Sequence, residues 1–183
     1  MIWLFIGVPL LIILLVIIGI YNNLVSLKMR VKNAWAQIDT QLKRRFDLIP
    51  NLVETVKGYA SHEESTLEKV IEARNQYAQS SNVAEAAAAD NMLTGTLKSL
   101  FALSEAYPDL KANQNFMALQ VELVGTEDKV AFARQFYNDT VNSYNEAILV
   151  FPSNIFANMF GYTAEPFFEI VNSVEKEPVK VQF

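Results

Sequence analysis

IWLFIGVPLLIILLVIIGI, residues 2–20, is the stretch that decides how this chain is built. Its nineteen residues carry no charge, and fifteen of them are Leu, Ile, Val or Phe. At about 1.5 Å of rise per residue, a helix of this length spans roughly 28 Å, close to the thickness of the hydrocarbon core of a bilayer. Its summed insertion free energy is about −5 kcal/mol, which outweighs the cost of Gly7, Pro9 and Gly19. We therefore predict a transmembrane anchor over residues 1–20.

A cleaved signal peptide is the alternative interpretation of the same run. It would need a basic segment before the apolar residues and a small-x-small site after them. The sequence has neither feature around residues 2–20, which favours an uncleaved anchor.

The charges that flank the anchor predict its orientation. Between Tyr21 and Arg45 there is one acid, Asp39, and there are six basic residues: Lys28, Arg30, Lys32, Lys43, Arg44 and Arg45. Basic residues favour the cytoplasmic side, so the N-terminus is expected outside and the long C-terminal part in the cytoplasm. We assign Lys28, Arg30 and Lys32 to contact with anionic lipid headgroups.

Composition narrows the possible partners and chemistry. The chain has no cysteine, so disulfides and thiol chemistry are excluded. Its net charge of −5 argues against nucleic acid as a partner. Residues 60–110 hold eight acids and three bases, so the acidic part of the chain lies away from the basic flank of the anchor.

Apolar residues recur at helical spacing along most of the remaining chain. They predict four helices, at about 21–57, 62–80, 83–106 and 115–151, arranged as an up-and-down antiparallel four-helix bundle over residues 21–151. Pro50 is expected to kink the first helix or to restart it with Asp47 as the cap. Ser61 and Glu64 form the pattern of a capping box at the start of the second helix. The fold class is therefore all-α, with the transmembrane helix continuous with the bundle.

Helix lengths predict a stalk of two helices next to the membrane. The first and fourth helices each hold about 37 residues beyond the bilayer, roughly 55 Å, whereas the second and third are shorter. Only residues 21–38 and about 135–151 would then lie near the lipid, and their coiled-coil-like spacing carries many large apolar side chains. We expect neighbouring copies to cover them, giving a homo-oligomer, unless the two helices satisfy each other. The stalk residues are Leu24, Leu27, Val31, Trp35, Tyr137, Tyr144 and Ile148.

An aromatic segment follows the fourth helix. FPSNIFANMFGYTAEPFF, residues 151–168, has six aromatics and no basic residue, with Pro152 placed to start a short helix and Gly161 to end it. A short helix and hairpin over residues 152–170 would either lie at the membrane interface or fold back over the open end of the bundle. The interface residues would be Phe151, Phe156, Phe160 and Tyr162.

Sequence signals for catalysis are weak. The sole histidine, His62, stands beside Glu63 and Glu64 without the second histidine of a zinc-protease motif, so it is interpreted as a solvated residue. No phosphate-binding loop, nucleophile elbow or dinucleotide turn is present, and we expect no enzyme, metal or cofactor. Some polar residues fall near the apolar stripes and would fix the helix register if buried. They are Asp39, Asn51, Gln120, Glu127, Arg134 and Asn138.

The last residues, KVQF in the tail 171–183, end in an apolar residue with a free carboxylate. A PDZ-like domain binds such an end by strand addition, with Val181 and Phe183 as the docking residues.

Three segments together resemble the LemA family: YNNLVSLKMRVKNAWAQIDTQLKRRFDLIPNLVETVKGYASHE (21–63), LSEAYPDLKANQNFMALQVELVGTEDKVAFARQFYN (103–138) and YNEAILVFPSNIFANMFGY (144–162). Their order and spacing also match, so the resemblance covers nearly the whole chain. It implies a helical-bundle protein of the bacterial inner membrane with no accepted catalytic residues. Members linked to magnetosome membrane formation suggest membrane shaping, and members encoded near HtpX-type membrane metalloproteases suggest an adaptor.

Two functions remain open on these grounds. The first is a non-enzymatic, membrane-anchored scaffold that self-associates and organises or shapes the bacterial cell membrane. The alternative is a monomeric adaptor that docks a membrane protease or an envelope-stress sensor through its cytoplasmic bundle or its KVQF tail.

Overall fold

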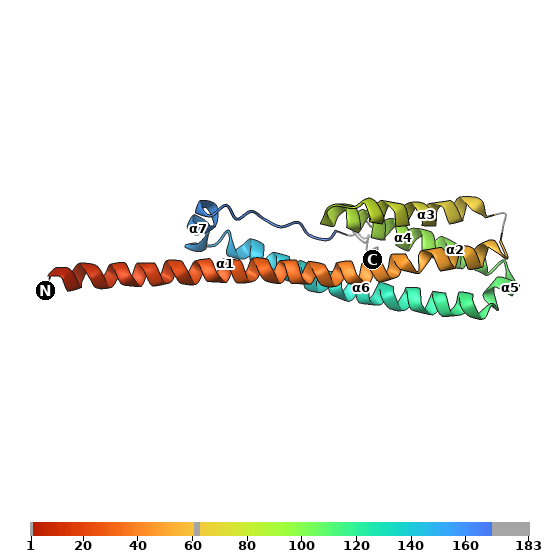
Figure 1. Ribbon diagram of the computed structural model, residues 1–183, viewed down its shortest axis with the longest axis horizontal. Coiled ribbons are helices and arrows are strands. Elements are labelled where there is room, and N and C mark those ends of the chain that lie inside the picture. The colour runs from red at the N-terminus through yellow and green to blue at the C-terminus, as the bar shows by residue number, and fades with distance from the viewer. Residues whose placement is uncertain (1, 61–62, 170–183) are drawn as a thin grey trace, which may run out of the picture. The chain divides into compact units, whose positions relative to one another are not determined.

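The structure is a computed structural model that describes residues 2–60 and 63–169. Within these ranges every regular element is a helix, which confirms the all-α fold class with a long N-terminal apolar helix (Figure 1). The chain divides into two compact units. Unit 1 contains Met1–Asp39 and Phe132–Phe167, and unit 2 contains Thr40–Ala131 and Phe168–Phe183. The elements are α1 (Ile2–Asp47), α2 (Ile49–Lys57), α3 (Glu64–Gln79), α4 (Val83–Ser104), α5 (Pro108–Lys111), α6 (Gln114–Ala147) and α7 (Ser153–Met159).

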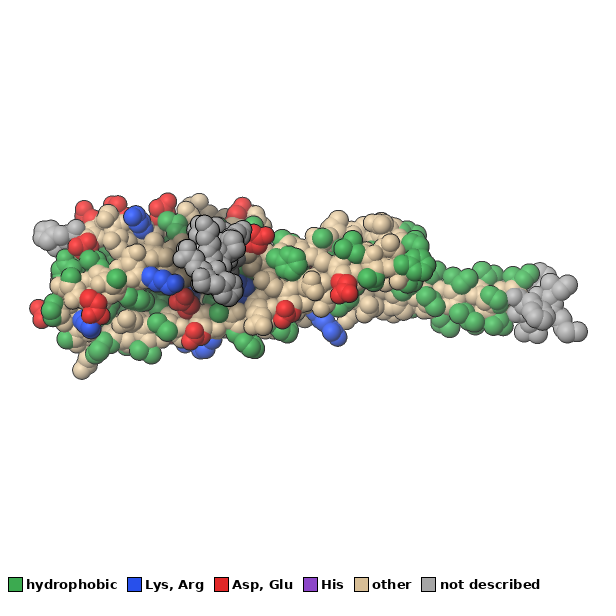
Figure 2. Space-filling view, turned by 180° about the vertical axis from the view of Figure 1, so that it is seen from behind, with side chains coloured by type: hydrophobic (Ala, Val, Ile, Leu, Met, Phe, Trp, Pro, Cys, Tyr) green, Lys and Arg blue, Asp and Glu red, His purple; other side chains and the backbone are tan. Residues whose placement is uncertain are grey.

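The start of α1 is the one helical stretch in the described residues that is long and apolar enough to cross a membrane. Nearly every residue from 6 to 20 is exposed, so none of the other described residues covers this surface. Figure 2 shows the same stretch as green side chains with no red or blue between them. An apolar surface of this kind is stable in lipid and costly in water.

Helix α1 ends at Asp47, and α2 begins two residues later with Pro50 in its first turn. The missing amide of Pro50 costs little there, because the first turn of a helix has no acceptor for it. The expected cap by Asp47 is wrong: Leu48 occupies the cap position and makes no side-chain cap bond. Leu48 keeps helical angles, φ −77° and ψ −20°, so the backbone never opens into the extended form that a capping side chain needs.

Unit 1 is built on one apolar stripe from each long helix. On α1 the buried residues follow helical spacing, and on α6 they are three or four residues apart. These stripes meet in the interior of the unit. They consist of Leu24, Val31, Ala34 and Ile38 from α1, and Ala133, Tyr137, Val141 and Tyr144 from α6.

Unit 2 contains the end of α1, then α2 to α5, and the first part of α6. The rings of Phe46 and Tyr77 stack at 4.3 Å and join α1 to α3. The rings of Phe101 and Phe116 meet edge to face at 6.2 Å and join α4 to α6. Four helical segments thus contribute to one core.

Polar side chains cap the start of α4 in unit 2. The Asn82 side chain accepts a hydrogen bond from the Glu85 amide, and the Glu85 carboxylate accepts one from the Ser81 amide. These reciprocal bonds satisfy free amides at the start of α4. The box expected at Ser61 falls on a residue outside the described ranges, as does His62, and α3 begins at Glu64 with no side-chain cap.

Candidate functional site

Helix α7 lies next to the end of the apolar stretch of α1. The ring of Phe160 packs edge to face on Tyr21, with 5.0 Å between the ring centres. Tyr21 is the first residue after the nineteen-residue apolar run. Figure 1 shows α7 beside α1 in this part of the chain. The aromatic segment is therefore placed at the boundary where the predicted anchor ends.

Gly161 turns the chain out of α7. Its φ of +73° lies in the left-handed region, which glycine adopts without strain. The Tyr162 amide donates to the Ala157 carbonyl, and the Gly161 amide donates to the Asn158 carbonyl. These two bonds form a Schellman motif that satisfies the last carbonyls of the helix. The turn directs the following residues back along α6.

Residues 162–167 form an extended segment, here called the strap. The Tyr144 hydroxyl donates to the Thr163 carbonyl over 2.9 Å, and the Tyr137 hydroxyl donates to the Pro166 carbonyl over 2.8 Å. Asn145 pairs with the backbone of Glu165 through two bonds of 2.9 Å, one in each direction. The strap is thus fixed to α6 through its main chain.

Lys28 of α1 lies against the strap from the other helix. Its ammonium group is 5.5 Å from the centre of the Tyr162 ring and 4.0 Å from a carboxylate oxygen of Glu165. A cation over an aromatic face and beside a carboxylate is favoured electrostatically, but modestly because the group is exposed. Lys28 therefore links α1 to the strap in unit 1.

The two tyrosines under the strap, Tyr137 and Tyr144, have raised pKa values. Burial, with a smaller contribution from the Glu165 carboxylate, raises the pKa of Tyr137 to about 12. Burial also raises the pKa of Tyr144, again helped by Glu165. Both hydroxyls therefore stay protonated near neutral pH, as hydrogen-bond donation to the strap requires.

The structure places most of the expected stalk residues inside unit 1. Tyr137 and Tyr144 are covered by the strap, and Trp35 packs edge to face on Tyr137 at 5.9 Å. Leu24, Val31, Tyr137, Tyr144 and Ile148 are buried, whereas Leu27 and Trp35 are half-buried. From the sequence, we expected that two helices could not cover these side chains. In the structure the strap adds a third layer that covers them. These residues leave little surface for another copy.

The other predicted site residues fall into three groups. Phe151 and Phe160 are exposed, and Phe156 and Tyr162 are half-buried, all in unit 1. Lys28, Arg30 and Lys32 are exposed on α1. Val181 and Phe183 lie outside the described residues, so the structure gives no position for the tail-docking site.

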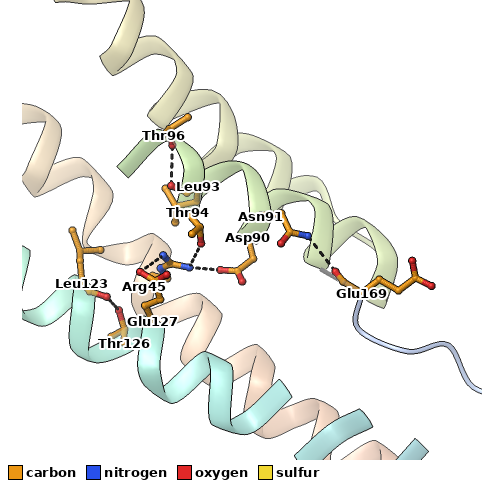
Figure 3. Close-up of polar contacts among 10 residues, drawn as sticks. All are labelled: Arg45, Asp90, Asn91, Leu93, Thr94, Thr96, Leu123, Thr126, Glu127 and Glu169. Atoms are coloured by element: carbon orange, nitrogen blue, oxygen red, sulfur yellow. Dashed lines mark hydrogen bonds and ion pairs between the residues drawn. The ribbon is translucent and has the colours of Figure 1, made fainter. Parts of the chain in front are cut away.

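A buried ion pair joins α1 to α4 in unit 2 (Figure 3). Arg45 is 1% exposed, and its Nη1 donates to Asp90 over 2.5 Å and to Thr94 over 3.0 Å. Its Nη2 lies 3.4 Å from a carboxylate oxygen of Glu127 on α6, without hydrogen-bond geometry. Two charged partners offset the cost of removing the guanidinium from water. Arg45 thus fixes the relative register of three helices.

Arg45 and Asp90 were missed as core polar residues, and Arg45 was counted with the basic flank of the anchor. A signal was present, since Arg45 continues the apolar stripe of Ile38, Leu42 and Ile49 at spacings of four, three and four. Among the polar residues that were expected near the core, Asp39 and Asn51 are exposed, and Gln120, Glu127, Arg134 and Asn138 are half-buried.

Two open grooves complete the list of candidate sites. In unit 1, a groove of about 380 Å³ lies between α1 and α6 and is lined by Leu27, Arg30, Asn33, Gln37, Phe136, Asp139, Thr140 and Ser143. In unit 2, a groove of about 430 Å³ lies between α2 and α6 and is lined by Asn51, Glu54, Thr55, Asn115, Ala118, Leu119 and Glu122. Among the described residues no group of three His, Cys, Asp or Glu is arranged to hold a metal ion.

Comparison with known proteins identifies the family. Residues 34–183, well over half of the chain, match the LemA family. This chain belongs to the LemA family. The resemblance noted in the sequence is thereby confirmed.

The individual curated relatives are only distantly similar to this chain in sequence. Protein LemA of Metamycoplasma hominis is 27% identical over 146 residues, covering 78% of this chain and 65% of the relative. Magnetosome proteins MamQ 1 and MamQ 2 of Paramagnetospirillum magneticum are each 21% identical over 175 residues, covering 81% of this chain and 64% of the relative. This chain therefore spans just under two thirds of the length of these relatives. Its family and its N-terminal apolar helix agree in indicating a membrane-associated protein.

Proposed function

We propose that this LemA-family chain is a non-enzymatic, membrane-anchored scaffold that self-associates and organises or shapes the bacterial inner membrane. The observation that carries the proposal is the uncovered apolar start of α1, which continues without a break into the helix that forms the framework of unit 1. The family and the named relatives are not known as enzymes. Two relatives are named magnetosome proteins, in accord with a role in shaping membranes.

Self-association needs a surface other than the buried stalk residues. We place it on the outer face of α6 in unit 1, where Phe132 is 75% exposed and Phe136 is 48% exposed. The two rings stand four residues apart and so lie on one face of the helix. Phe136 and Leu27 also line the groove between α6 and α1, which gives a neighbouring copy an apolar recess to fill. Pairing of this face with its equivalent on a second copy would form a two-fold interface.

The mass of the full-length protein in mild detergent tests the scaffold. The expected result is a particle with several copies, and Phe132→Ser with Phe136→Ser shifts it toward the monomer. Asn142→Ser is the matched control, because Asn142 is an exposed position further along α6 and is not three or four residues from either ring. A wild-type particle with the mass of one chain would remove the scaffold proposal.

A second candidate is a monomeric adaptor for a membrane protease of the HtpX type or for an envelope-stress sensor. The groove of unit 2 favours it, because the carboxylate of Glu54 and the amides of Asn51 and Asn115 offer acceptors to a basic peptide segment, beside a Glu122 that is paired with Arg44. The adaptor predicts a monomer that co-purifies with one other protein. Glu54→Gln would then weaken recovery of that partner, and deletion of residues 180–183 would show whether a PDZ-like domain binds the tail instead.

A further inference from the structure

Helix α7 and the residue before its N-cap carry exposed apolar side chains, here called the ridge. Phe151, Ile155 and Met159 are 79%, 55% and 63% exposed. Ile155 and Met159 lie four residues apart on one side of α7, and Phe151 precedes the helix, directly before its N-cap Pro152. Ala157, on the other side, is buried against unit 1. The short helix therefore packs on the protein with one face and presents large apolar side chains with the other.

The surroundings of the ridge contain no charge. Between Glu146 and Glu165, eighteen residues pass without a charged side chain. Leu149, Val150 and Phe160 add further exposed apolar surface beside the ridge. The charges that interactions place here are Lys28, whose ammonium group lies over Tyr162 at the rim of the patch, and Glu165, whose carboxylate is 4.0 Å from that group. A contiguous apolar surface whose charges stay at its rim is typical of a surface that enters a bilayer.

The ridge is continuous with the predicted membrane span. Phe160 packs on Tyr21, the residue that directly follows the apolar run of α1. A helix that leaves the bilayer at this residue holds α7 at the level of the lipid headgroups, where aromatic side chains concentrate. The ridge therefore contacts lipid and not a protein partner. A protein partner would have to displace the bilayer that the anchor already brings to this place.

We propose that Phe151, Ile155 and Met159 insert into the same leaflet from which α1 emerges, as a second membrane contact that acts beside the anchor. The inference rests on the proposed membrane anchoring. The anchor alone fixes one point in the bilayer and leaves the protein free to tilt, whereas an inserted second element beside it fixes the tilt of unit 1 and pushes apart the lipid headgroups of one leaflet.

The absence of cysteine permits a direct test by single labelled cysteines. Full-length Ile155→Cys, Leu14→Cys and Ala88→Cys proteins are spin-labelled and reconstituted in vesicles of phosphatidylcholine and phosphatidylglycerol. Accessibility to oxygen, which partitions into lipid, is compared with accessibility to a polar nickel complex. Leu14 lies in the anchor, and Ala88 is exposed on α4 in unit 2. We expect oxygen to dominate at positions 14 and 155, and nickel to dominate at position 88.

Each outcome has a distinct meaning. If nickel dominates at position 155 while oxygen dominates at position 14, the second contact is wrong and the anchor stands. If nickel dominates at both positions, the anchoring itself fails. A label at 155 that is shielded from both reagents would mean that α7 is covered by protein, which also overturns the proposal. Met159→Cys, one turn further along the ridge, provides an independent repeat.

Discussion

Arg45 shows how strongly a single buried charge depends on its partners. Asp90→Ala would leave the guanidinium with the neutral Thr94 hydroxyl and one charged partner, the partly exposed Glu127 at 3.4 Å. Removal of one partner from a buried ion pair costs about 3–5 kcal/mol, and the remaining acid points to the lower end, about 3 kcal/mol. Unfolding of the full-length protein by urea in mild detergent measures the loss.

A matched pair on the surface serves as the control. Lys111 and Glu105 form an exposed salt bridge in unit 2, so Glu105→Gln should change the unfolding free energy by less than about 1 kcal/mol. The double variant Arg45→Met with Asp90→Leu should be more stable than Asp90→Ala, because no uncompensated charge stays in the core. An Asp90→Ala protein as stable as the wild type would contradict the role assigned to this pair.

Tyr137 links stability to alkaline pH. Its pKa rises from an ordinary value of about 10 in the unfolded chain to about 12 in the folded one. The folded state therefore binds the proton more tightly, and the resulting stabilisation is complete below pH 10 and is lost as the pH rises through 12. In a titration followed by tyrosinate absorbance, Tyr137→Phe should lose the last-titrating step. An unchanged titration would mean that this hydroxyl is not shielded under the strap.

Which residues are buried could be predicted only in part from the sequence. The burial of hydrophobic residues such as Leu24 and Val31 follows from helical spacing alone. The burial of Arg45 does not, because a basic residue near an anchor resembles one that faces lipid, and the acid that neutralises it stands 45 positions away in the sequence. Pairing at that range depends on how the helices pack.

At the level of the element, Gly161 and Gly95 differ in backbone conformation and not in the space for an added methyl group. Neither has an atom within 4 Å of an ideal Cβ, so space is available at both. Gly161 has a φ of +73°, whereas Gly95 lies inside α4. We expect Gly161→Ala to lower the melting temperature, at a cost of about 1 kcal/mol, and Gly95→Ala to raise it by a gain of about 0.5–1 kcal/mol. Changes of the same sign in both variants would contradict this.

At the scale of elements, the periodicity of apolar residues predicts the helices but not the strap that packs against α6. The long apolar run and the helical class follow from the sequence, and Pro152 and Gly161 mark a short helix. The strap has no periodic pattern, because α6 binds its carbonyl groups rather than its side chains. For this reason the stalk was predicted with two layers instead of three.

The orientation of the whole molecule is testable with the same cysteine-free background. The basic residues beyond Tyr21 predict a cytoplasmic location for unit 2. Ala88→Cys should therefore resist a membrane-impermeant maleimide in intact cells and react after the cells are opened. Labelling in intact cells would reverse the predicted topology. Arg30→Gln with Lys32→Gln should weaken the bias and give a labelled minority.

The way the strap is attached determines which positions can vary among related chains. Its anchoring partners on α6 need a hydroxyl or an amide, so Tyr137, Tyr144 and Asn145 have few acceptable replacements. Thr163 and Pro166 contribute only carbonyl oxygens, which every amino acid possesses. Substitutions at Thr163 and Pro166 can therefore accumulate while the course of the strap stays the same, whereas Tyr162 and Glu165 also contact Lys28 through their side chains.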